Sequence, residues 1–452
     1  MSTIIDRPRY VCALGGALAF IRAMKRTVPI VHAATGCAYN YYIGGNAGAG
    51  YFGGGYCGAT SIPSSNVSEK EIIFGGEARL EEQIRTTMEV IDGDLYIVIS
   101  GCMIEMIGDD IRSKTDQMEG LPEKVFAVPT PSFKGNAQHG YDLVLEKLIR
   151  TYITRQETKQ PNRVNVFGVI PGNDIFYKGN LKEIKRVLKR IGVEAHTFIG
   201  EGETLEDVKH AGNAALNLVL SDVYAPLSAE AFKEVHDIPY IRELMPIGFL
   251  QTERFLRNVG NALNQIHPGC IDAGILDEAL HAEQDIYFDY FERIADAYND
   301  IDLQRYGVVA ADSNYAPGIS NFISDELGWI PYLTMITDSV SDENREALDK
   351  RFAGYASGLK PLVYYDPSAS ALRHYLTESW EQNRNHRYYE PLAPLVIFGS
   401  SFEKDFAEEL GAPLLTVSFP TTSRVVFNKG YAGFNGGLAL AEEAFSLIVA
   451  GR

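Results

Sequence analysis

The chain has 452 residues, of which 46% are hydrophobic and 11% aromatic, so it can bury a large core and is not a disordered protein. Its formal net charge of -18 argues against nucleic acid as a partner, because phosphate backbones are bound by clustered lysine and arginine. Its five cysteines suggest no disulfide framework, and the sequence shows neither a secretory signal nor a membrane span, so we expect no membrane association and a cytoplasmic location.

The first part of the chain is predicted to alternate strands and helices. Apolar runs predict strands around Ile30, Leu95 and Val125. A helical spacing of apolar residues predicts a helix over residues 78–91. These elements indicate an α/β domain at the start of the chain.

Three cysteines of this first part lie where the chain is expected to reverse direction. Cys12 precedes two glycines at 15–16, and Cys37 and Cys102 each follow a glycine shortly after an apolar run. Thiolates on loops at strand ends can converge, as they do around metal clusters. None of the three has the CxxC spacing of a zinc ribbon, so the fold must assemble any shared site. A lone cysteine usually packs as a small hydrophobe, and only the joint placement favours a cluster.

One structural unit recurs from residue 163 onward. It consists of an apolar strand, a turn with glycine or serine, an amphipathic helix, a glycine stop and a second strand. Its copies are expected at residues 163–199, 306–336 and 395–418. Strands joined through helices by short connections form parallel sheets flanked by helices, with right-handed crossovers.

We therefore predict an α/β fold of three Rossmann-like domains, at residues 1–160, 161–300 and 301–452. The polar segment 156–163 is predicted to link the first two domains. The second boundary falls within helical sequence at 277–300, and a C-terminal helix is expected to close the third domain.

Apart from the three early cysteines, few residues form a pattern that predicts a catalytic or binding function. The glycine-rich stretch 44–58 matches neither a P-loop nor a GxGxxG after a strand, so it indicates either a close backbone approach or an ordinary loop. Cys57 within it and the distant Cys270 are predicted not to be metal ligands. The histidines form no HxxxH or HExxH pair, and no GxSxG elbow predicts a serine hydrolase.

Residues 97–110 read Ile-Val-Ile-Ser-Gly-Cys-Met-Ile-Glu-Met-Ile-Gly-Asp-Asp and closely resemble the nitrogenase component 1 superfamily. In that family a cluster-ligating cysteine is followed by an acidic residue and an Ile-Gly-Asp-Asp run. The resemblance extends over nearly the whole chain. Further landmarks, several of them typical of β-type subunits, lie at residues 31–37, 72–76, 130–135, 213–217, 245–248 and 430–433.

The resemblance implies three Rossmann-like domains and a P-type [8Fe-7S] cluster shared with an α-type subunit. Cys12, Cys37 and Cys102 would be the thiolate ligands of this chain, with Cys37 bridging the two halves of the cluster. The hydroxyl of Ser132 stands where β-type subunits can offer an oxygen ligand to the oxidised cluster, and an ordinary turn serine is the alternative. A [4Fe-4S] cluster is the alternative cofactor.

The resemblance also indicates which subunit this is. Family α subunits bind the catalytic cofactor through a cysteine and a histidine, but Ser221 stands where that cysteine is expected, and no histidine follows His386. We therefore expect a β-type subunit without a catalytic cofactor of its own. It would pair with an α subunit in an (αβ)2 heterotetramer and receive electrons from an ATP-dependent iron protein.

Two departures from conventional β subunits point to a nitrogenase-like branch. Only a short segment precedes Cys12, and residues 40–45 are unlike the molybdenum, vanadium and iron-only β subunits. Methylthio-alkane reductase is the leading expectation. The alternatives are the β subunit of a true nitrogenase, a cofactor-assembly scaffold and a chlorophyllide-type reductase subunit with a four-iron cluster. A metal-free binding protein would leave the motif around Cys102 unexplained.

Overall fold

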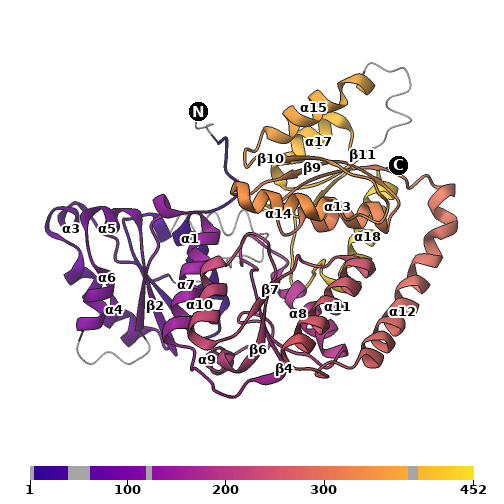
Figure 1. Ribbon diagram of the computed structural model, residues 1–452. Coiled ribbons are helices and arrows are strands. Elements are labelled where there is room, and N and C mark those ends of the chain that lie inside the picture. Colours follow the sequence, from indigo (N-terminus) through magenta and orange to yellow (C-terminus); the bar gives the residue numbers. More distant parts are fainter. Residues whose placement is uncertain (1–4, 39–61, 119–124, 385–394, 452) are drawn as a thin grey trace.

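The computed structural model describes residues 5–38, 62–118, 125–384 and 395–451. It contains three sheets whose paired strands all run parallel, and helices cover them (Figure 1). This arrangement confirms the predicted α/β class. None of the helices in the described part of the chain combines the length and the apolarity needed to cross a bilayer.

The first sheet has the strand order β1-β2-β3. Its strands are β1 (Thr27–His32), β2 (Leu95–Ser100) and β3 (Val125–Pro129). β1 and β2 are buried along their whole length, as expected for apolar parallel strands covered on both faces. The helices of this part are α1 (Ala13–Ala23), α3 (Glu69–Phe74), α4 (Glu77–Val90), α5 (Cys102–Ile107), α6 (Ile111–Gln117), the 3₁₀ turn η2 (Ser132–Lys134) and α7 (Ala137–Thr151).

The second sheet has the order β5-β4-β6-β7. Its strands are β4 (Gln160–Phe167), β5 (Glu194–His196), β6 (Ala214–Val219) and β7 (Tyr240–Arg242). Its helices are α8 (Tyr177–Arg190), α9 (Leu205–Lys209), η3 (Ala211–Asn213), α10 (Pro226–His236), α11 (Gly248–Ile266) and α12 (Ala273–Asp300). The predicted linker is partly wrong, because residues 160–163 already belong to β4 and pair with β5 and β6. A register shift between Gln160 and Val164 accommodates the proline that suggested a linker.

The third sheet has the order β10-β9-β8-β11-β12. Its strands are β8 (Tyr306–Ala311), β9 (Ile330–Ile336), β10 (Leu362–Tyr365), β11 (Leu395–Gly399) and β12 (Leu414–Thr416). Its helices are α13 (Ala316–Asp325), α14 (Asp342–Phe352), α15 (Ala371–Arg384), η4 (Ser401–Glu403), α17 (Lys404–Leu410) and α18 (Gly433–Ala450). The three recurring units predicted from the sequence are each present as a strand, a helix and a parallel strand.

Helices α1 and α7 pack so closely that each presents a glycine to the backbone of the other. A Cβ added to Gly16 of α1 would lie 2.0 Å from the carbonyl oxygen of Ala137. A Cβ added to Gly140 of α7 would lie 1.8 Å from the carbonyl oxygen of Ala13. The two glycines therefore fix how α1, and with it the cysteine that precedes it, sits on the first sheet.

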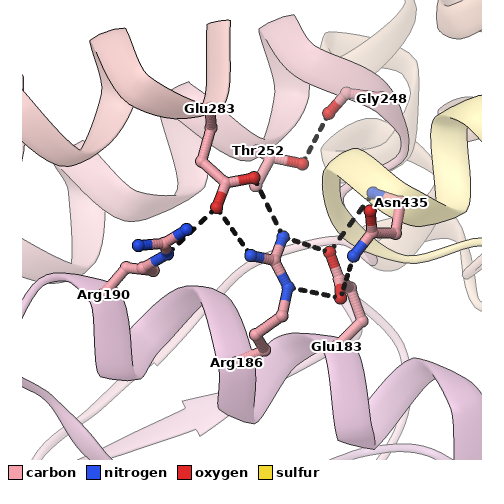
Figure 2. A network of polar contacts seen from close by, with 7 residues as sticks. All are labelled: Glu183, Arg186, Arg190, Gly248, Thr252, Glu283 and Asn435. Atoms are coloured by element: carbon pink, nitrogen blue, oxygen red, sulfur yellow. Dashed lines mark hydrogen bonds and ion pairs between the residues drawn. The ribbon is translucent and has the colours of Figure 1, made fainter. Parts of the chain in front are cut away.

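Helix α8, beside the second sheet, is tied to α12 and α18 through a network of ion pairs and hydrogen bonds (Figure 2). Arg186 of α8 donates to Glu183 at 2.8 Å and to Glu283 of α12 at 2.6 Å. Asn435 of α18 donates to Glu183 at 3.0 Å, and Arg190 donates to Glu283 at 3.1 Å. The last helix of the chain is thus bound to the second sheet's helices, while its Leu440, Ala444 and Phe445 pack in the core of the third. The proposed division at residue 300 remains a prediction.

Asp174, between β4 and α8, gives a pH prediction. It accepts hydrogen bonds from the Tyr315 hydroxyl at 2.9 Å and from Asn180 at 3.0 Å, yet burial raises its pKa to about 6. The folded chain therefore holds this proton more tightly than the unfolded chain, and its contribution to stability falls as the pH rises from about 4 to about 6. The Asp174→Asn variant should lack this pH dependence. In urea unfolding, its free energy of unfolding should therefore rise relative to that of the wild type by at most about 3 kcal/mol between pH 4 and pH 6. Parallel pH profiles of the variant and the wild type would contradict it.

Candidate cluster-binding site

The carboxyl ends of all three strands of the first sheet meet at one edge. The register pairs His32 with Ser100 and Ser100 with Pro129, so the strands end side by side. The chain that follows β1 carries Cys37, the residue after the turn that ends β2 is Cys102, and the turn after β3 carries Ser132. Three of the four predicted ligands therefore leave adjacent strands at the same sheet edge, where parallel α/β folds commonly bind their ligands.

Cys102 and Ser132 are in direct contact. The sulfur of Cys102 lies 2.7 Å from the Ser132 hydroxyl oxygen, and the backbone N–H of Ser132 donates to the same sulfur at 3.2 Å. Cys102 begins α5 and is half-buried, with Gly101 as the residue before the helix. The turn after β3 thus places both a hydroxyl and a backbone donor against this thiol.

Gly101 allows the Cys37 and Cys102 segments to approach each other. A Cβ added to Gly101 would lie 2.7 Å from the Cβ of Ala33 and 3.7 Å from the sulfur of Cys37. The Gly101 N–H donates to the carbonyl oxygen of His32 at 2.9 Å, which ties the two strand ends together. A side chain at this position would push the two thiol-bearing segments apart.

The pKa of the Cys37 thiol depends on its burial and on the other two cysteines. Burial raises the pKa of the half-buried Cys37 thiol, and the negative charges of Cys12 and Cys102 raise it further. The geometry agrees with this effect. The Cys37 sulfur lies beside Gly101, the residue before Cys102, and Cys12 lines the same hollow as Ser132, which contacts Cys102.

Cys12 is the exposed member of the group. It is the residue before α1, and the N–H of Gly16 donates to its carbonyl oxygen at 3.0 Å. The prediction of a chain reversal here is wrong, because Gly15 and Gly16 lie within α1, where Gly16 packs against α7. The backbone of Cys12 forms an antiparallel bridge with Asn136, and Cys12 and Ser132 line an open hollow of about 780 Å³.

A single metal ion and an iron–sulfur cluster require different arrangements of the donor atoms. Within residues 5–38, 62–118, 125–384 and 395–451, no three histidine, cysteine or acidic side chains lie close enough to hold one ion. A single ion draws sulfur ligands to about 2.3 Å from its centre. An iron–sulfur cluster instead distributes thiolates over several iron atoms. Among the described residues the three predicted thiols are thus not grouped around a single ion, and they are the donor type that iron–sulfur clusters use.

A buried polar group beneath the site was not anticipated from the sequence. Nδ1 of His32 lies 2.9 Å from the Ser65 hydroxyl, and its Nε2 lies 3.4 Å from Asp109. Asp109 also accepts from the N–H of Gly76 at 2.8 Å, and burial lowers the pKa of His32. These contacts brace the end of β1, from which the Cys37 segment departs.

The acidic pair of the Ile-Gly-Asp-Asp run has two structural roles. Asp109 contacts His32, as described above. Asp110 caps α6 by accepting from the N–H groups of Arg112 at 3.1 Å and Ser113 at 3.0 Å. The run after Cys102 therefore fixes the position of the helices around the site.

The remaining candidates lie elsewhere. Cys57 and the glycine-rich stretch 44–58 fall outside the described residues. The thiol of Cys270 donates to the carbonyl oxygen of Pro161 at 3.2 Å, at the start of the second sheet. Ser221 accepts from the N–H groups of Val223 and Tyr224 at 3.0 and 2.9 Å, so its hydroxyl closes a local turn.

Fold and site together define an α/β protein with three parallel sheets and a group of thiols at the edge of the first. The family model described as Nitrogenase component 1 type Oxidoreductase matches residues 12–448, and the chain belongs to this family. The family predicted from residues 97–110 is thereby confirmed.

Similar proteins include three nitrogenase β chains. The molybdenum-iron protein beta chain of Sinorhizobium fredii is 24% identical over 97% of this chain and 82% of its own length. That of Methanococcus maripaludis is 24% identical over 99% and 95% of the two chains, and the vanadium-iron protein beta chain of Trichormus variabilis is 24% identical over 95% and 91%. These relatives confirm the β type predicted from the sequence.

A solved structure shows the same fold. The structure of nitrogenase Cp1 at pH 6.5 superimposes with a TM-score of 0.78, covering 100% of this chain and 94% of the other. The sequence identity is 20%, so this likeness concerns the fold alone.

Proposed function

We propose that this chain is the β-type subunit of the catalytic component of a nitrogenase-like reductase and holds a P-type iron–sulfur cluster at its contact with an α-type subunit. The observation that carries the proposal is the gathering of Cys12, Cys37 and Cys102 at the edge of the first sheet. Thiolates are soft, anionic donors that suit iron. Membership of an oxidoreductase family supports the redox role.

The cluster, when bound, supplies one-electron transfer, and the residues of this chain hold it and control its surroundings. Cys37 and Cys102 would bind from the half-buried side, and Cys12 from the exposed side. Ser132, whose hydroxyl and N–H both contact the Cys102 sulfur, would tune that thiolate through hydrogen bonding or supply an oxygen ligand.

The exposed position of Cys12 supports a site that a partner completes. An α-type subunit covering the thiols would exclude water and supply the remaining ligands, in an (αβ)2 heterotetramer. Electrons would come from an ATP-dependent iron protein and pass to a catalytic cofactor in the α subunit. Ser221, engaged in a local turn, supports the proposal that this chain binds no catalytic cofactor.

For the physiological reaction we propose methylthio-alkane reduction. The proposal rests on residues 40–45, which differ from conventional β subunits. The alternative functions are dinitrogen reduction and a role in cofactor assembly, and the experiments below distinguish them from methylthio-alkane reduction.

The test is anaerobic co-purification with the α partner, followed by an iron count and redox spectra of the αβ unit. About eight irons in an interface cluster, as two four-iron halves would give, supports the proposal. A four-iron site favours the chlorophyllide-type alternative, and an unchanged cluster spectrum in Cys102→Ala would overturn the ligand assignment.

The substrate is identified by turnover of the complete system with dimethyl sulfide, acetylene and dinitrogen. Reduction of dimethyl sulfide without reduction of dinitrogen supports the methylthio-alkane assignment. Reduction of dinitrogen identifies a true nitrogenase, and failure to turn over any of the three with a fully loaded cluster favours an assembly scaffold.

A further inference from the structure

The segment before Cys12 is attached to the third sheet, although Cys12 belongs to the first. We call residues 6–12 the N-terminal strap. In Figure 1 the start of the chain runs from the third sheet to the first. The carbonyl oxygen of Asp6 accepts from the N–H of Ala369, in the loop after β10, at 2.8 Å. The strap therefore spans the gap between two sheets.

Arg9 anchors this strap through a buried ion pair. Its guanidinium binds both carboxylate oxygens of Glu403, in η4 of the third sheet, with an Nη1–Oε2 distance of 2.9 Å. The side chains of Arg9 and Glu403 are 1% and 2% exposed. The same guanidinium donates to the Ser400 hydroxyl at 2.9 Å and to the Ala369 carbonyl oxygen at 3.2 Å. A forked pair of this kind fixes direction as well as distance.

Glu403 is itself held rigidly. It accepts from both the N–H and the hydroxyl of Ser400 at 2.8 Å, which closes a capping box directly after β11. The anchor for Arg9 is thus attached to a central strand of the third sheet. Arg7 provides a contrast on the same strap, because its guanidinium also lies over the Phe402 ring, at 5.3 Å against 5.5 Å for Arg9, but is 66% exposed.

The other end of the strap is fixed to the site. The carbonyl oxygen of Val11 accepts from the N–H of Ala137 at 2.9 Å, and Cys12 bridges to Asn136. Only three residue steps separate Arg9 from Cys12, a span of at most about 11 Å. Between two fixed ends, so short a segment has little freedom in where it places the thiol.

We infer that Arg9 is a positioning residue for Cys12: its buried pair with Glu403 uses the third sheet to set the place of a thiol on the first. This inference rests on the proposed role of Cys12 as a cluster ligand. It explains why an exposed cysteine can have a defined position before a partner covers it. It also gives the third sheet a part in assembling the site, although none of the predicted ligands lies there.

The experiment compares Arg9→Ala, Arg9→Lys and the matched control Arg7→Ala in the full chain. Hydrogen exchange is followed at the amide of Ala137, which donates to Val11, and in β8 as a reference. Arg9→Ala should speed exchange at Ala137 by about ten-fold or more and leave β8 within about two-fold, since only the strap loosens. Arg9→Lys should lie between it and the wild type, and Arg7→Ala should match the wild type.

The same variants in the αβ complex give a second readout, the electron paramagnetic resonance spectrum of the cluster. Arg9→Ala should change its line shape, Arg9→Lys should restore it in part, and Arg7→Ala should leave it unchanged. Wild-type exchange at Ala137 in Arg9→Ala, or a loosened strap with an unchanged spectrum, overturns the inference. If Arg9→Ala fails to fold, an unaltered Ala137 exchange rate and spectrum in Arg9→Lys overturn it.

A separate variant tests the proposed role of Cys12 as a cluster ligand, independently of the role of Arg9. Cys12→Ala in the αβ complex removes the thiol without touching the anchor. An unchanged cluster spectrum in Cys12→Ala would show that Cys12 is not a ligand, whatever the exchange rates of the Arg9 variants.

Discussion

Replacing Gly140 with alanine is expected to destabilise the folded chain by about 3 kcal/mol and to displace α1 from α7. The added methyl group would lie 1.8 Å from the carbonyl oxygen of Ala13, which is backbone and cannot rotate away. The helices must therefore separate, although alanine is the better helix former by about 0.5 to 1 kcal/mol. Since Ala13 follows Cys12 directly, the displacement should also lower the iron content of the αβ complex.

Urea unfolding of the isolated chain measures this effect, and Gly260→Ala is the matched control. Gly260 lies within α11, where an added Cβ would meet Ile271 at 3.5 Å, an ordinary contact. That variant should be as stable as the wild type or more stable. Equal unfolding midpoints for Gly140→Ala and Gly260→Ala would show that the close contact of α1 with α7 is not rigid.

Replacing Cys37 with alanine is expected to remove most of the cluster iron from the αβ complex. The Cys37 sulfur lies 3.7 Å from the position that a Cβ on Gly101, the residue before Cys102, would take. The family resemblance gives it the bridging position, and a bridging ligand holds both halves of a cluster. Iron analysis and the absorption spectrum of the anaerobically purified complex measure the loss.

Cys270→Ala is the control for that experiment. Cys270 is also a half-buried free cysteine, but its thiol donates to Pro161 at the second sheet. Its replacement should leave the iron content at the wild-type level. Full iron content in Cys37→Ala would remove this residue from the ligand set and leave the bridging assignment without support.

The recurring units were predictable because their signals are local. The run 306–336 has an apolar strand, a helical spacing and a glycine stop within a few residues of one another, and the structure places β8, α13 and β9 there. The helix predicted over 78–91 is α4, shifted by one residue at each end. Periodicity and glycine caps depend on neighbouring residues alone, so a single sequence is enough to read them.

The parts that the sequence did not predict depend on contacts between distant segments. The glycines after Cys12 indicated a turn, whereas the structure uses Gly16 inside a helix because α7 must approach it closely. Arg9 and Glu403 are 394 positions apart, and no local pattern marks either as a buried partner. The three cysteines were singled out from their placement near predicted strand ends, and the family resemblance added Ser132. The contact of the Cys102 sulfur with Ser132 depends on the order of the strands.

The last helix and the N-terminal strap have a consequence for the order of events during synthesis. Helix α8 leaves the ribosome long before Asn435, which completes its ion-pair network, and Arg9 leaves long before Glu403. During synthesis, domains generally fold as units, and the N-terminal domains fold first. Here the second sheet lacks part of its helical cover, and the Cys12 segment lacks its anchor, until the last fifth of the chain has been made. The anchor that we propose for Cys12 is therefore completed only after Glu403 has been synthesised, when nearly the whole chain has been made.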